Sequence, residues 1–402
     1  MAEKYKIGII GTGFIARGLS MALEHSAQLE VSYVLTRRTA VSLNEFPLPR
    51  KKITRDMQQL ITGSDLVVEC SGDVIHGTVM AEQALAAGLP IVTMNAELQI
   101  VSGTMLARQG MFVEAEGDQP GTLARLDQDV RQMGFQPLVY GNIKRFLNLH
   151  PTPDEMAYWS KRQGISLPQV TSFTDGTKIQ IEQALVANGL GASIAKRNLT
   201  GIACKDVEDG ARQLAEIAVA HGQPISDYVL CPTGPAGVFI VATHNGNQQP
   251  YLEYLKLGQG PFYVILQPYH LCHLEIPKTI LNVLSGAHPY RFNNSQQPTI
   301  QVAAVAKRAL SPGEVIPRGS GSFTVRGEAV KIIDEPKAVP VSLLQDAVIT
   351  APVAEGQTLT FDDVQLPKSR ALELWKLTLA EALAPAVKKP SLRVRTSLAA
   401  TK

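Results

Sequence analysis

A glycine-rich turn between a strand and a helix is the feature that most constrains the fold of this chain. The segment KYKIGIIGTGFIARGLSMALEH begins with an apolar run, continues with Gly11-x-Gly13-x-x-Ala16, and ends in a helical repeat of apolar residues. Gly11 permits the tight turn, and Gly13 lets a pyrophosphate approach the backbone. The helix start, which carries Phe14 and Ile15, offers unpaired N–H groups and partial positive charge to the phosphates. The segment therefore predicts a dinucleotide-binding α/β fold.

The end of the second expected strand indicates which dinucleotide binds. The strand LEVSYVLT ends at Thr36, twenty residues after Ala16, where a fold that prefers NAD places an acid on the ribose hydroxyls. The chain has no acid there and reads Thr36-Arg37-Arg38 instead. The two guanidinium groups and the hydroxyl can hold a 2′-phosphate through charge-assisted hydrogen bonds. We therefore expect NADP rather than NAD; two solvated loop arginines are the alternative interpretation.

Strands and helices continue to alternate along the first 145 residues. Further segments of this kind are SDLVVECSG, VIHGTVMAEQALAAG, LPIVTMN, GMFVEAEGDQPG, a helix from Leu123 to Met133, and FQPLVYGN. This alternation predicts a Rossmann-type, doubly wound parallel sheet over residues 1–145. Ligands of such sheets bind beyond the carboxyl ends of the strands. Candidates for the nicotinamide or substrate edge are therefore Ser71, Gly72, Asn95 and Asp118, with turn chemistry as the alternative for each.

Length, charge and cysteine content narrow the class of protein. A chain of 402 residues is expected to form two or three domains. With 38 basic and 36 acidic residues, net charge gives no reason to expect a nucleic-acid or membrane partner, so a small molecule is the expected partner. The cysteines match neither a zinc pattern nor a disulfide framework; they are Cys70, Cys204, Cys231 and Cys272. Reduced thiols, the absence of a signal-peptide pattern and the lack of a long apolar run predict a cytoplasmic protein.

The pattern changes after YGNIKR, and residues 146–298 are expected to form an α+β substrate domain. HPTPDEMAYWSKRQG begins a helix with Thr152 as cap, Pro153 at the first position and Glu155 three residues after the cap, the signature of a capping box. GVFIVAT, YLEYLKLG and PFYVILQ are interpreted as strands, with a hairpin turn at Asn245-Gly246. An antiparallel sheet with helices is a plausible floor for a substrate pocket.

The segment TDGTKIQIE is interpreted as a helix start that carries a possible catalytic group. At about 100° per residue, Asp175, Lys178 and Glu182 fall within roughly 60° of one another. A reductase needs a proton donor or a fixed positive charge at the oxygen that becomes negative. Lys178, or Lys144 after the last strand of the first domain, suits that role, while Asp175 and Glu182 would orient the lysine or the substrate. The alternatives are a solvated Lys178–Glu182 pair and a solvated loop lysine.

The cluster YHLCHLEIP contains His270 and His273 three positions apart, followed by Glu275. On a helix the two histidines would share a face, as metal ligands require, whereas on a strand their rings would point to opposite sides. The β-rich flanks favour a strand. We therefore expect packed or substrate-contacting histidines and predict no metal site, with metal ligation as the alternative.

Several motifs carry a family resemblance. The first domain resembles homoserine dehydrogenases in IGIIGTGFIARG, VVECSG and IVTMN. That family continues the last motif with a catalytic lysine, where this chain has Ala96, and it pairs an aspartate and a lysine four residues apart, whereas Asp175 and Lys178 are three apart. These departures argue against a true homoserine dehydrogenase, which stays an alternative.

A closer resemblance covers nearly the whole chain. GDQPG, GNIKR, TSFTDGTK followed by VAN, and PYHLCHLEIP are similar to motifs of the homoserine-dehydrogenase-like oxidoreductases that end in a SAF domain, the deoxyxylulose-phosphate reductoisomerase-like group. The resemblance implies an NADPH-linked reduction of the carbonyl of a small polar metabolite, phosphorylated or not. It also implies that Lys144, Asp175, Lys178 and Glu182 line the substrate site. A reductoisomerase would usually use a divalent metal, but no carboxylate cluster indicates one. A non-catalytic NADP-binding or sensing protein is the alternative function.

The C-terminal region, residues 299–385, is expected to be a small β-rich domain. VAKRALSPGEVI and ITAPVAEGQTLTFDDV share a layout of strand, turn with Gly313 or Gly356, and strand, as a diverged internal repeat would. This region resembles the SAF module. We expect it to pack against the reductase core or to mediate contacts in a homo-oligomer; closing over the substrate is the alternative. The basic residues 386–402 are expected to form a mobile tail.

Overall fold

The first part of the chain forms a six-stranded, fully parallel sheet, as the sequence predicts. The fold is that of a computed structural model, which describes residues 3–39, 46–286 and 291–384. The strand order is β3-β2-β1-β4-β5-β6. The strands are β1 (Tyr5–Ile10), β2 (Leu29–Leu35), β3 (Ile53–Thr54), β4 (Leu66–Glu69), β5 (Ile91–Thr93) and β6 (Phe112–Glu114). The order reverses between β1 and β4, where open α/β sheets bind ligands beyond their carboxyl ends.

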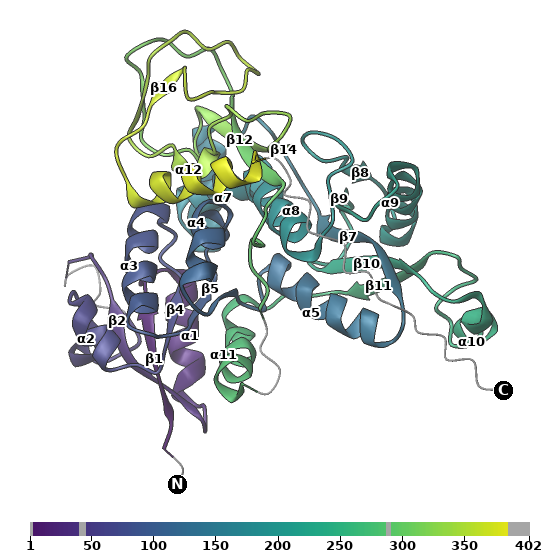
Figure 1. Cartoon of the computed structure of the whole chain (residues 1–402), viewed down its shortest axis with the longest axis horizontal. Helices are drawn as coiled ribbons and strands as arrows, with labels where there is room; N and C mark the ends of the chain where they lie inside the picture. The colour runs from purple at the N-terminus through teal and green to yellow at the C-terminus, as the bar shows by residue number, and fades with distance from the viewer. Residues whose placement is uncertain (1–2, 40–45, 287–290, 385–402) are drawn as a thin grey trace, which may run out of the picture.

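Helices cover both faces of this first sheet because its strands are apolar on both sides. Ile7 and Ile9 pack with α1 (Phe14–Glu24) and α11 (Ile276–Ser285). The opposite face, which carries Ile10 and Val67, packs against α2 (Met57–Thr62), α3 (Val74–Ala86) and α4 (Ala96–Gln109). Figure 1 shows these helices around the purple and blue strands.

A second, mixed sheet has the order β11-β10-β7-β9-β8. Its strands are β7 (Gln136–Lys144), β8 (Ile202–Ala203), β9 (Ile225–Leu230), β10 (Val238–Thr243) and β11 (Tyr263–Gln267). β7 runs parallel to β9, and β10 runs antiparallel to both β7 and β11. One face packs against α5 (Gln119–Gln132) and α8 (Thr177–Leu190), the other against α9 (Val207–His221).

The expectation that FQPLVYGN extends the first sheet is wrong, since this segment is β7 at the centre of the second sheet. The edge of the first sheet is already occupied. The Glu114 N–H of β6 donates to the Phe292 carbonyl at 2.8 Å, and Asn293 Nδ2 donates to the Phe112 carbonyl at 3.3 Å. With that edge covered by residues 291–293, β7 pairs with β9 and β10 instead.

Two other segments expected to be strands are helical. The first half of YLEYLKLG lies in α10 (Gln249–Tyr254), which has a proline in its first turn, and the second half forms a turn. Asn245 begins a short 3-10 helix (Gly246–Gln248) by accepting a hydrogen bond from the Asn247 N–H, so no tight hairpin forms there. YHLCHLEIP enters a 3-10 helix (Cys272–Leu274) and then α11.

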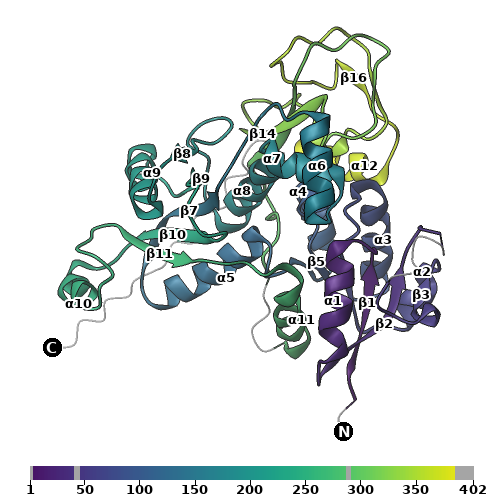
Figure 2. The same cartoon turned by 180° about the vertical axis from the view of Figure 1, so that it is seen from behind.

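The expected capping box is confirmed at the start of α6 (Pro153–Gln163), where Thr152 and Glu155 exchange side-chain and backbone hydrogen bonds. The following α7 (Leu167–Thr174) begins with a second capping box, formed by Ser166 and Gln169. In Figure 2, α6 and α7 lie above the N-terminal helix α1. This position makes the α6–α7 connection a wall of the cleft described below.

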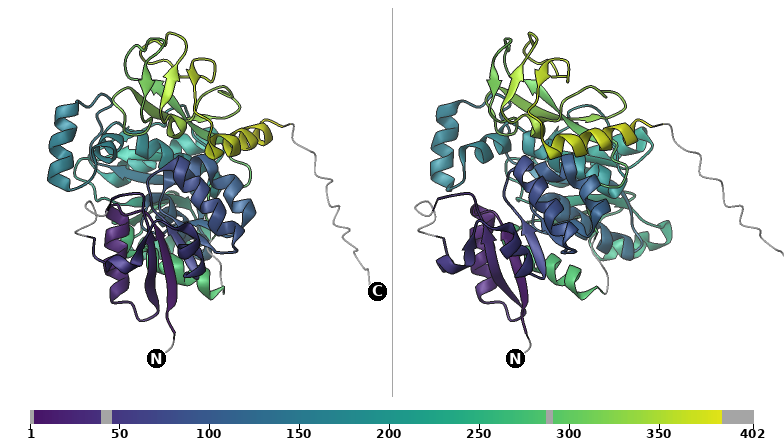
Figure 3. Two further views of the ribbon diagram at one scale, coloured as in Figure 1. Left: turned by 90° about the vertical axis from the view of Figure 1, so that its left-hand side faces the viewer. Right: turned by 60° about the vertical axis from the view of Figure 1, so that its left-hand side comes forward.

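The C-terminal region forms two small sheets. β12 (Ile300–Ala306) pairs with β14 (Val325–Lys331), and β15 (Ala347–Ile349) lies between β13 (Val315–Ile316) and β16 (Val364–Gln365). The expected repeat of strand, glycine turn and strand is present, and its halves meet in a bridge between Leu310 and Val353. A 3-10 helix (Val341–Leu343) follows β14. Figure 3 shows this region on top of both sheets, with α12 (Arg370–Ala382) returning over α3 and α4.

Residues 386–402, expected to be a mobile tail, lie outside the described residues. Within the described ranges, no helix has both the length and the apolar character needed to cross a membrane.

Asn188 on α8 joins the C-terminal region to the core. Its Nδ2 donates to Asn294 Oδ1 at 2.8 Å and to the Ile300 carbonyl at 2.9 Å. Its Oδ1 accepts from the N–H groups of Thr299 and Ile300, both at 2.9 Å. The side chain is buried, so all four contacts are shielded from water.

We predict that Asn188→Ala lowers the free energy of unfolding by about 2–4 kcal/mol, because it leaves buried backbone groups unpaired. Chemical denaturation followed by circular dichroism measures this change. Asn247→Ala, at an exposed position, is the control and should leave stability nearly unchanged. Equal midpoints for wild type and Asn188→Ala would contradict the role given to this side chain.

Candidate active site

A cleft of about 690 Å³ lies where the first sheet, α7, α8 and the C-terminal region meet. Three groups of lining residues come from the first sheet: 12–15 with 17 after β1, 38 after β2, and 70–72 and 94–97 after β4 and β5. The rest of the lining comes from parts of 164–173 and from Asp118, Lys178, Cys272, Arg318 and Ser320. Segments that are far apart in the sequence therefore line the same cleft.

The glycine turn has the form that a dinucleotide requires. Gly11 has φ +117°, and a Cβ there would lie 2.8 Å from the Cys70 carbonyl oxygen, so only glycine fits between the ends of β1 and β4. A Cβ on Gly13 would meet no atom within 4 Å, which shows that its backbone faces open space. No side chain caps α1, so its first N–H groups remain for phosphate oxygens. Phe14 and Ile15 line the same part of the cleft.

The residues expected to hold a 2′-phosphate divide into two groups. Thr36 lies 3.2 Å from the Thr12 hydroxyl and accepts from the Arg38 N–H at 3.1 Å, and Arg38 lines the cleft. The guanidinium of Arg37 instead forms an ion pair with Asp73, the N-cap of α3.

A second guanidinium approaches the Arg38 loop from β3. Arg55 Nη2 donates to the Arg38 carbonyl at 3.1 Å. Sequence analysis did not select Arg55, because only the pairing of β2 with β3 brings it beside residue 38.

The strand-end candidates Ser71, Gly72 and Asn95 all line the cleft. Ser71 donates through its backbone N–H to Glu69 Oε1 at 2.9 Å, and Asn95 caps α4 by accepting from the Leu98 N–H at 3.2 Å. Glu69 is fully buried, and this burial raises its pKa although the Ser71 hydrogen bonds oppose the shift. The strand ends are thus fixed by hydrogen bonds beneath the cleft surface.

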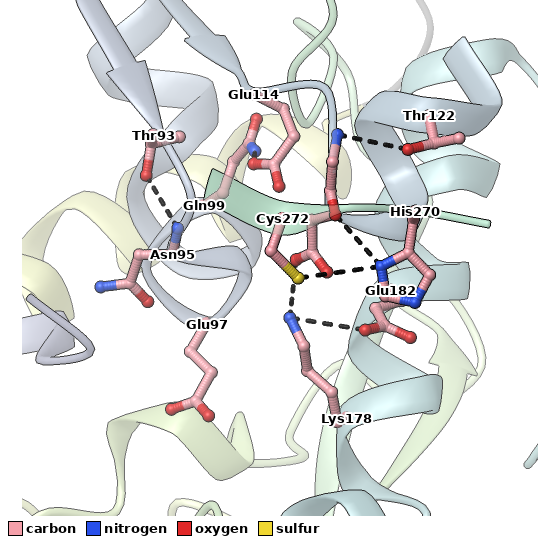
Figure 4. Close-up of polar contacts among 12 residues, drawn as sticks. Thr93, Asn95, Glu97, Gln99, Glu114, Thr122, Lys178, Glu182, His270 and Cys272 are labelled. Atoms are coloured by element: carbon pink, nitrogen blue, oxygen red, sulfur yellow. Dashed lines mark hydrogen bonds and ion pairs between the residues drawn. The ribbon is translucent and has the colours of Figure 1, made fainter. Parts of the chain in front are cut away.

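Lys178 projects from α8 into a group of acids. Its Nζ donates to Asp118 Oδ2 at 2.7 Å and lies 3.5 Å from Glu182 Oε1. The other oxygen of Glu182 accepts from Asn142 Nδ2 at 3.1 Å and lies 3.7 Å from Lys144 Nζ. Figure 4 shows Lys178 directed toward Glu182. Lys178 and Asp118 line the cleft, whereas Lys144 and Glu182 lie behind them.

The electrostatics of this group favour a charged Lys178. Burial pulls the pKa of Lys178 down, but the carboxylates of Asp118 and Glu182 outweigh it and hold the pKa above its usual range. Burial likewise opposes ionisation of Asp118, yet the Lys178 ammonium keeps the Asp118 pKa below its ordinary value. The pair is therefore ionised at neutral pH, and Lys178 is a positive group rather than a base.

Gln119 and His270 complete the polar surroundings, and sequence analysis did not select Gln119. With its nitrogen turned toward the carboxylates, the Gln119 amide donates to Glu182 Oε1 at 2.9 Å and to Asp118 Oδ1 at 2.6 Å. Its oxygen accepts from His270 Nε2 at 3.2 Å. The signal in the sequence was the polar pair Asp118-Gln119 at the helix start that follows β6.

The expectation that Asp175, Lys178 and Glu182 share one helical face is wrong for Asp175. α7 ends at Thr174, and Gly176 adopts φ +84° before α8 begins, so the helix is interrupted after Asp175. Asp175 Oδ2 accepts from Lys307 Nζ at 2.6 Å. Its other oxygen accepts from the Thr177 N–H at 2.8 Å. Lys178 and Glu182 do form the i,i+4 pair, but they are largely buried, so the alternative of a solvated pair is wrong.

The remaining candidates of YHLCHLEIP serve packing and local bonding. The His273 ring lies edge-on to Phe14 with centroids 6.0 Å apart, and burial lowers its pKa. Glu275 accepts from the Leu271 N–H at 2.7 Å and pairs with Lys278 at 3.0 Å. In the described ranges, no group of three or more His, Cys, Asp or Glu side chains is placed to hold a metal ion.

All four cysteines are free thiols, as expected. Cys272 lines the cleft, and burial together with the nearby Asp118 charge raises its pKa to about 12. The Cys272 thiol is therefore protonated at neutral pH and is a poor nucleophile.

Two known protein families match parts of the chain. Residues 8–108 match the family described as "Homoserine dehydrogenase, NAD binding domain", and residues 117–276 match "Oxidoreductase DRL, catalytic domain". No curated protein matches the chain. The two family matches, together with the parallel sheet and its glycine turn, identify an enzyme class. The chain is an NAD(P)-dependent oxidoreductase.

Solved structures of dehydrogenases and oxidoreductases are similar to the chain at low identity and with TM-scores below 0.5. A "probable dehydrogenase" from Thermotoga maritima has 12% identity and TM-score 0.45, covering 72% of this chain and 91% of its own. UDP-N-acetylglucosamine 3-dehydrogenase from Acidithiobacillus ferrooxidans has 12% identity and TM-score 0.42, covering 73% and 93%. An oxidoreductase from Agrobacterium radiobacter, in complex with NAD+, L-tartaric acid and magnesium, has 13% identity and TM-score 0.39, covering 73% and 92%.

Another buried acid, Glu114 at the end of β6, links the site to stability. It is fully buried and bonded to Gln99, and burial together with the Asp118 charge raises its pKa well above the ordinary value of 4.5. A group whose pKa is raised by folding stabilises the fold below its unfolded pKa and loses that contribution as pH rises through its folded pKa.

We predict that Glu114→Gln removes this dependence. Relative to the variant, wild type should lose about 1.4 kcal/mol of unfolding free energy per pH unit between the two pKa values of Glu114. Denaturant unfolding across a pH series measures the difference, with Glu208→Gln at an exposed position of α9 as control. Parallel curves for wild type and Glu114→Gln would refute the prediction.

Proposed function

We propose that this oxidoreductase uses NADPH to reduce the carbonyl group of a small polar metabolite in the cleft that Lys178 lines. The observation that carries the proposal is one cavity shared by an uncapped glycine turn and a largely buried ammonium. Bound NADPH would supply a hydride to the carbonyl carbon. The residues of the chain then have to bind the coenzyme, place the substrate and manage the charge on its oxygen.

Lys178 is proposed to act on that oxygen. As the carbon–oxygen double bond accepts the hydride, negative charge develops on oxygen, and a fixed ammonium stabilises this charge most in the reduced polarity of a cleft. Transfer of a proton from Lys178 Nζ to the oxygen yields the alcohol, and water returns a proton to the amine. The raised pKa of Lys178 makes it a stronger charge stabiliser than acid. The same property disfavours it as a base for the reverse oxidation.

Asp118, Glu182 and Lys144 are proposed to position this ammonium. Asp118 holds Lys178 from the cleft side, and Glu182 holds it from behind while contacting Lys144 through its other oxygen. Asp175 is proposed to act at greater distance, by fixing the turn that starts α8 through its contact with Lys307. The substrate polar groups would then meet Asp118 and the hydroxyl and amide groups of α7 that line the cleft, Ser172 and Gln169.

The motif resemblance supports a substrate class shared with homoserine-dehydrogenase-like or deoxyxylulose-phosphate-reductoisomerase-like enzymes, and a SAF-like identity for the C-terminal region. Ala96 begins α4 and is buried beside the cleft, where the homoserine dehydrogenases that the chain resembles carry a catalytic lysine. This residue is the reason to prefer a reductase other than homoserine dehydrogenase. A divalent metal remains part of the substrate screen below.

The first test screens NADPH oxidation against aldehydes, ketoses and their phosphates, with and without magnesium or manganese. We predict that Lys178→Met lowers kcat on the best substrate by about 10²–10⁴-fold while the Kd for NADPH stays within about threefold, because the ammonium acts on the substrate oxygen. Lys178→Gln, which retains a hydrogen-bond donor, guards against misfolding of the acid cluster. Coenzyme fluorescence and steady-state kinetics provide both quantities.

Two further lysines serve as comparisons. Lys161→Met, at an exposed position of α6, should leave kcat unchanged. Lys144→Met should lower kcat by a smaller factor than Lys178→Met, since the Lys144 ammonium pairs with Glu182 and is not among the residues that line the cleft. If every variant turns over at the wild-type rate, Lys178 has no catalytic role. If NADPH binds but no carbonyl is reduced, a non-catalytic binding protein is the better interpretation.

The preference for NADPH is proposed to depend on Arg38. It lines the cleft beside the end of β2, and no acid of the Thr36-Arg37-Arg38 segment competes for the ribose. We predict that Arg38→Ala raises the Kd for NADPH about tenfold or more and changes the Kd for NADH little, because the charge-assisted bond to a 2′-phosphate is lost. Fluorescence titration measures both constants.

Arg37→Ala is the matched control for this titration. The Arg37 guanidinium is engaged with Asp73, so its removal should affect NADPH less than removal of Arg38. Tighter binding of NADH than of NADPH by the wild type would contradict the proposed preference.

A further inference from the structure

A loop of the C-terminal region, residues 317–322 with the sequence PRGSGS, forms part of the cleft wall through Arg318 and Ser320. Three contacts fix this loop. Ser320 Oγ donates to Glu97 Oε1 at 2.6 Å, and Lys307 Nζ donates to the Ser322 carbonyl at 2.5 Å. Gly321 has φ +72°, and a Cβ there would lie 2.1 Å from the Pro168 carbonyl oxygen of α7. The loop is therefore held against α4 and α7 at once.

Arg318 differs from the other arginines of the C-terminal region. Arg308 pairs with Glu314 at 2.8 Å, Arg326 pairs with Glu328 at 2.6 Å, and Arg370 pairs with Glu82 at 2.9 Å. Within the part of the chain that the structure describes, Arg318 forms no ion pair or hydrogen bond, and it is exposed on the cleft wall. Its planar fork of N–H donors fits a carboxylate or a phosphate in two-point contact.

The contacts of the loop place Arg318 at the substrate end of the cleft. Ser320 bonds to Glu97, which follows Asn95 by two residues at the carboxyl end of β5. In parallel sheets of this order, the nicotinamide lies beyond the central strand ends, whereas the adenosine lies near the end of β2, where this chain has Arg38. Arg318 therefore lies at the same end of the cleft as the groups that would contact the substrate.

Among the described residues, neither acid that lines this end, Glu97 or Asp118, forms an ion pair with Arg318. The Lys178 ammonium pairs with Asp118 at 2.7 Å, and the Glu97 carboxylate, which also lines the cleft, accepts from the Ser320 hydroxyl rather than from Arg318. A substrate that brings a negative group would supply the missing partner. Because the loop backbone is already fixed, little backbone conformational entropy is lost when the loop binds a substrate anion.

We propose that Arg318 binds an anionic group of the substrate, a carboxylate or a phosphate, and so makes the C-terminal region the part of the active site that determines substrate specificity. The identity of that substrate rests on the proposed reduction. The anion site itself does not, because it is defined by the loop, its contacts and the unpaired guanidinium.

Anion binding is tested without turnover. Full-length protein saturated with NADPH, so that the nucleotide phosphate sites are filled, is titrated with inorganic phosphate and separately with acetate by calorimetry. We expect Arg318→Met to weaken the tighter-binding anion about tenfold or more, Arg318→Lys to have an intermediate effect, and Arg308→Met to match wild type. The anion that loses affinity identifies phosphate or carboxylate as the group recognised.

Kinetics then test the role in specificity with aldehyde pairs that differ only in a phosphate, a carboxylate or a hydroxyl at the far end. Arg318→Met should raise KM for the anionic member about tenfold to hundredfold, leave its kcat within about threefold, and leave the hydroxyl member unaffected. The Kd for NADPH should stay at the wild-type value.

Equal affinity of wild type and Arg318→Met for both anions, or no anion binding by the NADPH-saturated wild type, would overturn the proposal. A uniform loss of kcat on charged and uncharged substrates would overturn it as well. Failure of wild type to reduce any carbonyl would instead refute the proposed reaction, and the calorimetric comparison would still decide the role of Arg318.

Discussion

The rest of the site depends on the burial of one ammonium among acids. The Lys178 ammonium lies 2.7 Å from an Asp118 oxygen and 3.5 Å from a Glu182 oxygen. Glu114 is close enough to raise the pKa of Lys178 further. Removing charges from water is costly unless each is paired, so the positions of the elements that carry these groups are coupled. β6 supplies Glu114. α8 supplies Lys178 and Glu182, and the turn before α5 supplies Asp118. The cleft can exist only where the first and second sheets bring these elements together.

The C-terminal region contributes to this arrangement by holding the start of α8. The Gly327 N–H donates to Thr177 Oγ1 at 3.0 Å, and the Ala329 N–H donates to Gln180 Oε1 at 2.8 Å. Lys307 reaches the turn before α8 through Asp175, in an ion pair that is almost fully buried. Burial lowers the pKa of Lys307 although the Asp175 carboxylate opposes this. The contacts that pack the C-terminal region against α8 thus also fix the helix that carries Lys178 into the cleft.

Much of the local structure was predictable because local forces decide it. The glycine turn at Gly11, the capping box at Thr152 and the i,i+4 pair of Lys178 and Glu182 each depend on residues close in sequence. The failures have a different cause. β7 joined the second sheet because residues 291–293 cover the edge of β6, and the first half of YLEYLKLG became helical after a capping asparagine and a proline. Neither outcome is visible in an alternation of apolar and polar residues.

The sequence by itself determined that a nucleotide-binding parallel sheet begins the chain and that a lysine and a glutamate share one face of α8, because backbone sterics and helical periodicity act over a few residues. Only the tertiary structure decided which charges meet. It turned Asp175 away to Lys307, brought Asp118 and Gln119 to Lys178, and placed Arg318 on the cleft wall. These partners lie tens to hundreds of residues apart, and their contacts follow from how separate elements pack, which no local pattern records.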